Sequence, residues 1–320
     1  MEKGLISIIV PAHNVEKYID KSLRSLTNQT YRNLQIIVID DNSPDRAGEI
    51  ADEWAGRDSR ITVVHNEKNM GHSTVRNVGL DLAKGEYIGF TDPDDYVHPQ
   101  MFERLLELLK ENDADISLCL EQTFEDGEEE PELVYEPGKD IHIESHAEYI
   151  EHFMDSFTGP IGWSWNKLYK AEVLKSIRYR NYKLEDIIFH AEAAKGIKKA
   201  VWTDDRLYAY RIRTDSITGA GKTDITIPAS ESFWATYEML KSDEKDYADR
   251  FLIFTLGKIA NIYAQSKRRY GRDSANKMHE YYSVKYRENI EAIKCAPIKD
   301  RFKLFLARYF GAVYCLMAHG

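Results

Sequence analysis

A chain of 320 residues, of which 43% are hydrophobic and 30% charged, has the composition of a globular protein with one large domain and an appendage, or with two domains. No stretch reaches the roughly 18 consecutive apolar residues needed to cross a bilayer, and the net charge of −10 argues against a nucleic-acid partner. Cys119, Cys295 and Cys315 form no CxxC pair, so neither a disulfide framework nor a zinc site is expected.

The charge is unevenly distributed along the chain. Residues 258–308 contain 13 Lys or Arg and five Asp or Glu, a local net charge of +8, whereas the rest of the chain carries −18. Such a basic, aromatic-rich tail suits an anionic membrane surface. The apolar run at 5–10 is too short for the core of a signal peptide. We therefore expect a cytoplasmic protein that either stays free or binds peripherally to the inner membrane face.

Short apolar runs alternate with helical patterns through the first part of the chain, which is typical of a parallel α/β sheet. The sequence predicts strands at 5–10, 34–39, 61–65, 86–91 and 115–120. Helices are expected between them at about 15–26, 46–56, 73–83 and 99–112. A further strand pair is predicted at 199–204 and 206–213. From about residue 228 the pattern indicates helices alone, which puts a domain boundary near 222–228.

Two acidic groups directly follow predicted strands. The segment GFTDPDDY, residues 89–96, places three carboxylates at the end of the strand at 86–91, and Asp40 and Asp41 follow the strand at 34–39. Acids at such positions are also common in solvated turns and helix caps. Because open α/β sheets bind ligands beyond the carboxyl ends of their strands, we favour a binding role for both groups.

Three later segments leave structural and functional interpretations open. Glu185 and Asp186 begin a predicted helix, where the dipole favours negative charge, and a helix start also fixes a carboxylate in space. Trp163 and Trp165 in GWSWNKLYK suit core packing or the face of a sugar ring. The acidic run FEDGEEEPE at 124–132 is predicted to be a solvated loop or hairpin tip.

Six segments resemble, in order and spacing, those of the family 2 glycosyltransferases with the GT-A fold. They lie within about residues 5–218 and read SIIVPAHN, LQIIVIDDNSPD, NMGHSTVRNVGLDLAKGEYIGFTDPDD, WSWNKLY, LEDIIF and YRIRTDSIT. The resemblance implies an α/β fold: a Rossmann-like mixed, mostly parallel sheet flanked by helices. It assigns a nucleotide-sugar half to about 1–115, an acceptor half to about 116–224, and a helical C-terminal region to 225–320.

The resemblance also implies roles for individual residues. The residues expected to contact the nucleotide-sugar donor are Pro11, His13, Asn14, Asp41, Arg76, Asp92, Arg211 and Arg213. Of these, Asp41 would accept from a uracil ring, while His13 stands where many relatives have tyrosine. Asp94 would bind the divalent metal, Mn or Mg, and Asp186 would be the catalytic base. The residues expected to contact the acceptor or the donor sugar are Asp95, Trp163, Trp165, Asn166, Lys167 and Glu185.

The chemistry agrees with that assignment. A nucleoside diphosphate leaves readily only when its growing negative charge is neutralised, as by a Mg or Mn ion held by one or two carboxylates and phosphate oxygens. A base opposite the leaving group takes the proton of the acceptor hydroxyl. We predict a metal-dependent inverting glycosyltransferase that moves a sugar, expected to come from a UDP-sugar, to a hydroxyl of a glycan or lipid-linked acceptor in cell-surface polysaccharide synthesis.

Alternatives of other classes have weaker support. A nucleotidyltransferase acting on a sugar phosphate is expected to carry a Gly-rich phosphate loop after the first strand, but VPAHNVEKY contains no glycine. A receiver domain fits poorly, because a complete strand-helix unit precedes the Asp40 and Asp41 pair. A non-catalytic sugar-nucleotide-binding protein stays open. So does the role of the aromatic and basic segment at 298–320, including Phe302 and Phe305, which either packs on the catalytic domain or lies in a membrane interface.

Overall fold

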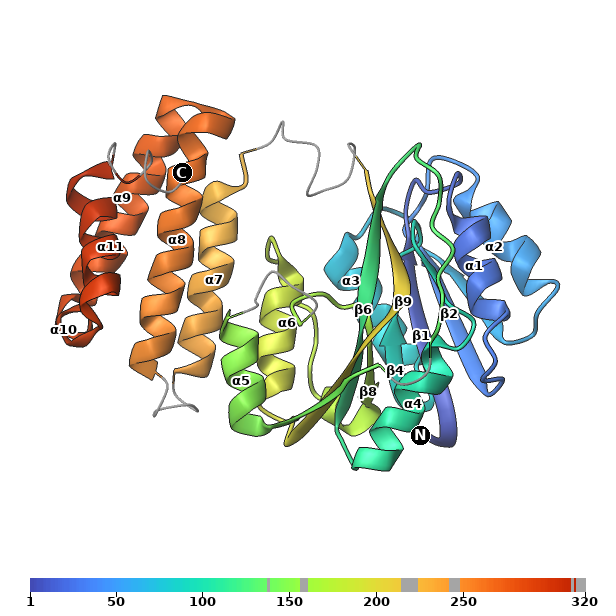
Figure 1. Ribbon diagram of the computed structural model, residues 1–320. Coiled ribbons are helices and arrows are strands. Elements are labelled where there is room, and N and C mark those ends of the chain that lie inside the picture. Colours follow the sequence, from blue (N-terminus) through green and yellow to red (C-terminus); the bar gives the residue numbers. More distant parts are fainter. Residues whose placement is uncertain (137–138, 156–160, 214–223, 242–247, 312–313, 315–320) are drawn as a thin grey trace. The chain divides into compact units, whose positions relative to one another are not determined.

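The computed structural model describes residues 1–136, 139–155, 161–213, 224–241, 248–311 and 314 (Figure 1). The chain divides into two compact units. The first comprises Met1–Asn181 and Ala193–Ser216, and the second comprises Tyr182–Glu192 and Ile217–Gly320. Part of the predicted boundary at 222–228, and residues 214–218 of the last resembling segment, lie outside the described residues.

Within the described residues, the first unit contains a nine-stranded mixed sheet. Its strands are β1 (Glu2–Ala12), β2 (Leu34–Asp40), β3 (Ile61–His65), β4 (Gly85–Phe90), β5 (Tyr96–Val97), β6 (Ile116–Glu125), β7 (Ile141–Ser145), β8 (Lys167–Lys170) and β9 (Lys199–Ile212). The strand order is β3-β2-β1-β4-β8-β6-β9-β5, and β7 pairs with β9. Strands β3, β2, β1 and β4 are mutually parallel, and so are β6 and β9, whereas β5, β7 and β8 pair antiparallel.

Helices cover both faces of the parallel part of the sheet (Figure 1). They are α1 (Ile19–Thr27), α2 (Ala47–Ala55), α3 (His72–Leu82) and α4 (Met101–Asn112). On one face, Ile8 of β1 shares a buried core with Leu23 of α1 and Ala51 of α2. On the other, Gly79 lets α3 approach β1 so closely that an added Cβ would lie 2.4 Å from Cγ2 of Ile9. Burial on both faces explains why these strands are continuous apolar runs.

The predicted strand pair at 199–204 and 206–213 is wrong in one respect: these residues form the single strand β9. The register against β6 shifts between Cys119, which faces Thr203, and Leu120, which faces Arg206. The extra residues on β9 therefore form a bulge, which interrupts the apolar pattern without turning the chain. The remaining helices of this unit are α5 (His146–Asp155) and the short 3₁₀ helix η1 (Ala171–Leu174).

The regular elements described in the second unit are all helices, as predicted for the C-terminal region. Its helices are α7 (Thr226–Leu240), α8 (Ala248–Tyr270), α9 (Arg272–Glu288), α10 (Ile290–Cys295) and α11 (Ile298–Tyr309), together with the start of α6 (Glu185–Ala194). Leu256, Met278 and Leu304 are among its buried residues. Among the helices described in either unit, none has the length and apolar character required to cross a membrane.

Candidate active site

The acidic loop that follows β4 contains one fully buried carboxylate, Asp95. Its side chain accepts hydrogen bonds from the hydroxyl of Tyr208, at 2.8 Å, and from the backbone N–H of Arg211, at 2.8 Å. Burial, and then the neighbouring charges of Asp94 and Asp92, raise the pKa of Asp95 well above its usual value. Asp95 thus joins the loop to β9 inside the protein, and its contact with the acceptor or the donor sugar stays a prediction.

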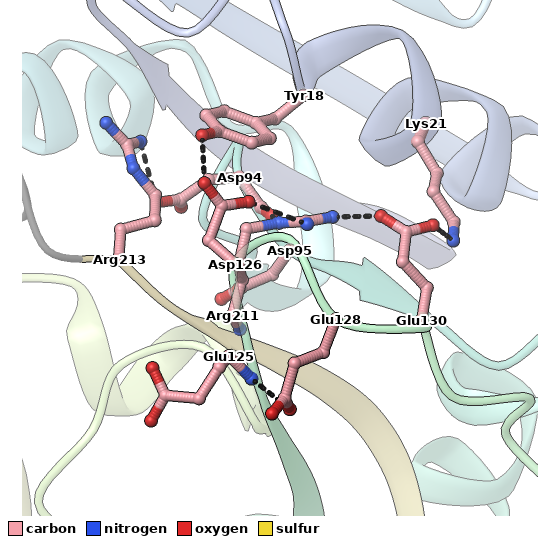
Figure 2. A network of polar contacts seen from close by, with 10 residues as sticks. All are labelled: Tyr18, Lys21, Asp94, Asp95, Glu125, Asp126, Glu128, Glu130, Arg211 and Arg213. Atoms are coloured by element: carbon pink, nitrogen blue, oxygen red, sulfur yellow. Dashed lines mark hydrogen bonds and ion pairs between the residues drawn. The ribbon is translucent and has the colours of Figure 1, made fainter.

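Asp94, the predicted metal ligand, is paired with a cation of the protein. Nη1 of Arg213 donates to Oδ2 of Asp94 at 3.0 Å, and Nε of Arg211 donates to its backbone carbonyl at 3.0 Å (Figure 2). Burial raises the pKa of Asp94, and the positive charge of Arg213 opposes that rise. Arg213 therefore offsets only part of the cost of burying the Asp94 carboxylate.

The acidic run at 124–132 is not merely a solvated loop. Within it, residues 125–130, here called the acidic strap, fold against Arg211 (Figure 2). Nη1 of Arg211 donates to Asp126 at 3.1 Å, Nη2 donates to Glu130, and Glu130 also pairs with Lys21. The hydroxyl of Tyr18 donates to Asp126 at 2.9 Å. These carboxylates compensate a guanidinium that is only 7% exposed, and a buried cation requires such partners.

Arg76 and Asp92, both predicted to contact the donor, bind each other. Nη2 of Arg76 donates to Oδ1 of Asp92 at 3.3 Å, and the guanidinium carbon lies 5.2 Å from the ring centre of Tyr179. The backbone N–H of Asp92 donates to the hydroxyl of Tyr208 at 3.1 Å. Tyr208 therefore contacts both ends of the acidic loop and keeps Asp92 and Asp94 at the carboxyl end of β4.

Asp41 organises the loop at 66–71. Its Oδ1 accepts from the side chain of Asn66 and from the backbone N–H of Met70, and its Oδ2 accepts from that of Gly71, each at 2.8 Å. Nδ1 of His13 donates to the carbonyl of Asp41 at 3.0 Å, because a carbonyl can only accept. Asp41 is 3% exposed, and the contacts of its side chain are with this loop. Its contact with a uracil ring stays a prediction.

The other two donor-site residues predicted near the end of β1 differ in exposure. Pro11 is buried in β1, where it lies opposite Ile39 of β2. Asn14 is exposed, has a positive φ of 55°, and donates its backbone N–H to the hydroxyl of Ser43 at 3.3 Å. The carboxyl ends of β1 and β2 therefore meet at one edge, as predicted for parallel strands.

Three of the four predicted acceptor residues around β8 are structural. Trp165 is 3% exposed, and its ring centre lies 4.2 Å from that of Tyr208. The side-chain amide of Asn166 donates to the carbonyl of Cys119 at 2.7 Å, and Nζ of Lys167 donates to Oδ1 of Asn166 at 2.6 Å. Asn166 and Lys167 are fully buried. Trp163 is partly exposed, and contacts of these four residues with the acceptor or the donor sugar stay predictions.

Glu185 and Asp186 begin α6, as predicted, directly after Leu184, whose φ is 57°. Both are partly exposed and belong to the second unit, whereas Asp94 belongs to the first. Their roles as base and as substrate contact stay predictions.

Asp92 and Asp94 fit a hard divalent cation. Among the residues described, no cluster of three or more His, Cys, Asp or Glu forms a complete metal cage. The side chains of Asp92 and Asp94 are 25% and 22% exposed, so their oxygens are accessible, and Arg213 already places a positive charge at Asp94. Mg is commonly held by one or two carboxylates, with phosphate and water oxygens as the other ligands.

Sequence patterns missed Tyr208 and the acidic strap as parts of this site. Tyr208 reads as an ordinary apolar position of a strand, and its hydroxyl reveals its role only through the two contacts with the acidic loop. The sequence contained one indication of the strap. Two arginines, Arg211 and Arg213, lie two residues apart at the end of β9, and the segment at 124–132 is rich in acids that could pair with them.

Comparisons with known proteins agree with this fold. The family described as "Glycosyl transferase family 2" matches residues 7–178. The chain is 36% identical over 224 residues to "Uncharacterized glycosyltransferase EpsJ" of Bacillus subtilis, covering 67% of this chain and 63% of that one. It is 33% identical over 223 residues to "Glycosyltransferase GlyG" of Streptococcus pneumoniae, covering 67% and 72%. The match to EpsJ thus spans somewhat less than two thirds of that relative.

Two solved structures have a similar fold. S. aureus TarS in complex with UDP-GlcNAc is 20% identical, with a TM-score of 0.60 over 89% of this chain and 92% of that one. Mannosyltransferase PcManGT from Pyrobaculum calidifontis, in complex with GDP-Man and Mn2+, is 14% identical, with a TM-score of 0.53 over 98% and 85%. At such identities the likeness bears on the fold alone, and it confirms the GT-A architecture. The fold, the acidic loop after β4 and the sequence relatives lead to one conclusion: the chain belongs to glycosyl transferase family 2.

Proposed function

We propose that the protein transfers a sugar from a UDP-sugar to a hydroxyl of a glycan or lipid-linked acceptor in cell-surface polysaccharide synthesis. Family membership supports glycosyl transfer, and the UDP-GlcNAc complex of TarS supports a UDP-sugar as the donor. One observation carries the proposal: Asp92 and Asp94 present accessible carboxylates at the carboxyl end of β4, beside Arg76 and Arg213. Carboxylates and guanidinium groups together suit a diphosphate that arrives with a cation.

Asp94, assisted by Asp92, would hold a Mg or Mn ion. When bound, the ion supplies positive charge that neutralises the leaving diphosphate. PcManGT, which has a similar fold, was solved with Mn2+.

The arginines at the end of β9 would bind phosphate oxygens. Guanidinium groups bind phosphates and carboxylates with the same paired geometry. In the structure the guanidinium N–H groups of Arg211 and Arg213 bind the carboxylates of Asp94, Asp126 and Glu130. When a diphosphate binds, its oxygens would replace carboxylate oxygens at these N–H groups.

Asp186 would act as the base. An oxygen of its carboxylate would take the proton from the acceptor hydroxyl as that hydroxyl attacks the anomeric carbon in a single displacement, which inverts the configuration. Its position at a helix start, after a residue with left-handed backbone, supports a fixed orientation of the carboxylate.

A donor-hydrolysis assay tests the proposal. UDP release is measured from a panel of UDP-sugars with Mn or Mg, with EDTA, and for Asp94→Asn. Glu111→Gln, an exposed carboxylate on α4, is the matched control. We expect slow hydrolysis of one donor by the wild type and by the control, and loss of hydrolysis with EDTA and with Asp94→Asn.

Other outcomes would overturn the proposal. Absence of UDP release, together with no metal-dependent UDP binding in calorimetry, would exclude a UDP-sugar as the donor. Release of pyrophosphate from UTP and a sugar phosphate would instead identify a nucleotidyltransferase. Analysis of the product anomer by NMR tests inversion separately.

A further inference from the structure

The helix α11 carries a row of exposed apolar side chains, here called the aromatic stripe: Ile298, Phe302, Phe305 and Tyr309. Their exposed fractions are 75%, 57%, 41% and 54%. They are spaced by four, three and four residues, and at about 100° per residue they fall within an arc of about 60° on one side of the helix. Monomeric proteins seldom expose so many large apolar groups in one row, and such rows mark interaction surfaces.

The opposite side of α11 is fixed against the helices α8 and α9. Leu304 and Ala307 are buried, at 1% and 0% exposure. The hydroxyl of Tyr282 donates to the carbonyl of Leu304 at 3.0 Å, and Nε2 of His279 donates to the carbonyl of Arg308 at 2.9 Å. These contacts fix the rotation of α11 about its axis, so the outward direction of the aromatic stripe is built into the helical unit.

Basic side chains lie on both sides of the aromatic stripe. At about 100° per residue, Arg301 and Arg308 fall about 70° and 90° from the centre of the stripe on one side, and Lys299 falls about 90° from it on the other. Lys303 lies about 130° from the centre, as far round the helix as the buried Leu304, and its Nζ approaches Gly257 of α8. The helix has a single acid, Asp300, which by the same geometry lies away from the stripe. Positive charge on both sides of an apolar row is typical of helices that lie in the interface of an anionic bilayer.

We propose that this face of α11 binds the surface of an anionic lipid bilayer, with the aromatic stripe at the boundary between headgroups and acyl chains and with Lys299, Arg301 and Arg308 at lipid phosphates. Lys and Arg extend their charged ends to the headgroups while their stems cover apolar surface. A second copy of this chain is a poorer partner, because a symmetric contact would bring the same basic residues of both copies together. This surface does not depend on the transfer reaction proposed above.

Vesicle co-sedimentation of the full chain tests the proposal. Vesicles of phosphatidylcholine alone are compared with vesicles that also contain phosphatidylglycerol, for the wild type, Phe302→Ser/Phe305→Ser and Lys299→Glu/Arg301→Glu. The control Arg268→Glu/Arg269→Glu makes the same charge change at exposed positions of α8. Substitutions at exposed positions are used in place of a truncation of α11, because a truncation would also remove Leu304 from the core. Circular dichroism checks that each variant is folded.

We expect the wild type and the α8 control to bind the anionic vesicles and not the neutral ones. Each α11 variant should lose at least about tenfold in partitioning. Failure of the folded wild type to bind anionic vesicles would overturn the proposal, as would undiminished binding by Phe302→Ser/Phe305→Ser. A wild-type dimer that this variant converts to monomers, with no vesicle binding, would assign the face to a second copy instead.

Discussion

Nη1 of Arg213 lies 3.0 Å from Oδ2 of Asp94, so the carboxylate expected to hold a metal ion is already paired with a positive charge from the end of β9. Arg211, two residues earlier, binds the carbonyl of the same aspartate and two acids of the strap, Asp126 and Glu130. The acidic loop and the end of β9 therefore form one charge network, whose members differ in their response to substitution and pH.

Substitution of Glu130 by Gln should destabilise the fold, because Arg211 then loses one of the carboxylates that compensate its burial. We expect the free energy of unfolding to fall by about 1 kcal/mol near pH 7, measured by urea denaturation. Glu128→Gln, in the same strap but without a contact to Arg211, should change it by less than about 0.5 kcal/mol. Equal effects of the two substitutions would contradict the role of the strap.

The effect of Glu130→Gln should also depend on pH. Burial favours the neutral form of Glu130, but hydrogen bonds from Arg211 and Lys21 prevail and lower its pKa below the usual value of 4.5. The stabilisation is therefore complete above about pH 4.5 and is lost as the pH falls through the lowered folded-state pKa. The wild-type and Glu130→Gln stabilities should converge in that range.

Asp95→Asn should show the opposite pH dependence. Burial raises the pKa of Asp95 well above 3.8, so the folded state binds a proton more tightly than the unfolded state does. Wild-type stability should therefore fall as the pH rises from about 3.8 through the raised pKa. Asparagine can still form hydrogen bonds with Tyr208 and Arg211 but carries no charge. The stability of the variant relative to that of the wild type should therefore rise with pH across that range. Parallel stability curves of the two proteins would contradict this.

Asp186→Asn should lower the turnover number of sugar transfer by at least about 100-fold while leaving UDP binding unchanged, because a base contributes to the chemical step alone. Steady-state kinetics and calorimetry measure the two effects. Glu185→Gln, the neighbouring acid, is the control and should retain most of the turnover. A loss of UDP affinity in Asp186→Asn that matches its loss of turnover would count against Asp186 as the base.

Gly79→Ala should destabilise the first unit by about 1–3 kcal/mol, because the new methyl group would lie 2.4 Å from Ile9. Gly56→Ala, where the nearest atom to an added Cβ is 3.5 Å away, should be close to neutral. Thermal unfolding of both variants measures the difference. A neutral Gly79→Ala would mean that α3 and β1 can move apart without cost.

The parallel part of the fold was predictable because its strands are apolar runs buried on both faces. The strand at 61–65 was predicted with the bounds it has, and the strand at 34–39 was short by one residue. In contrast, β5 has two residues, and every second residue of β7 is exposed, so neither gives a strong pattern. Pairing with β9 is what makes them strands.

The positions of the acids near the site could be read from the sequence, whereas the contacts that the side chains make could not. The acids after β2 and β4 were identifiable because they follow apolar strands. The use of Asn166 and Lys167 as buried structural partners was not, because the residues they bind include the carbonyl of Cys119, 47 positions away from Asn166. The pairing of Arg211 with Glu130 likewise joins segments 81 residues apart. Local periodicity carries no information about such pairs.

The bulge in β9 determines which side chains of its last part face the acidic loop. Before it, residues of β9 are offset from their β6 partners by 84 positions, as in Cys119 and Thr203; after it the offset is 87, as in Glu121 and Tyr208. Because side chains alternate between the two faces of a strand, an odd insertion exchanges the faces. Loss of a single residue at 204–207 would thus turn the side chain of Tyr208 away from Asp95. Chain length in this short stretch should therefore matter more to the enzyme than the identity of any residue within it.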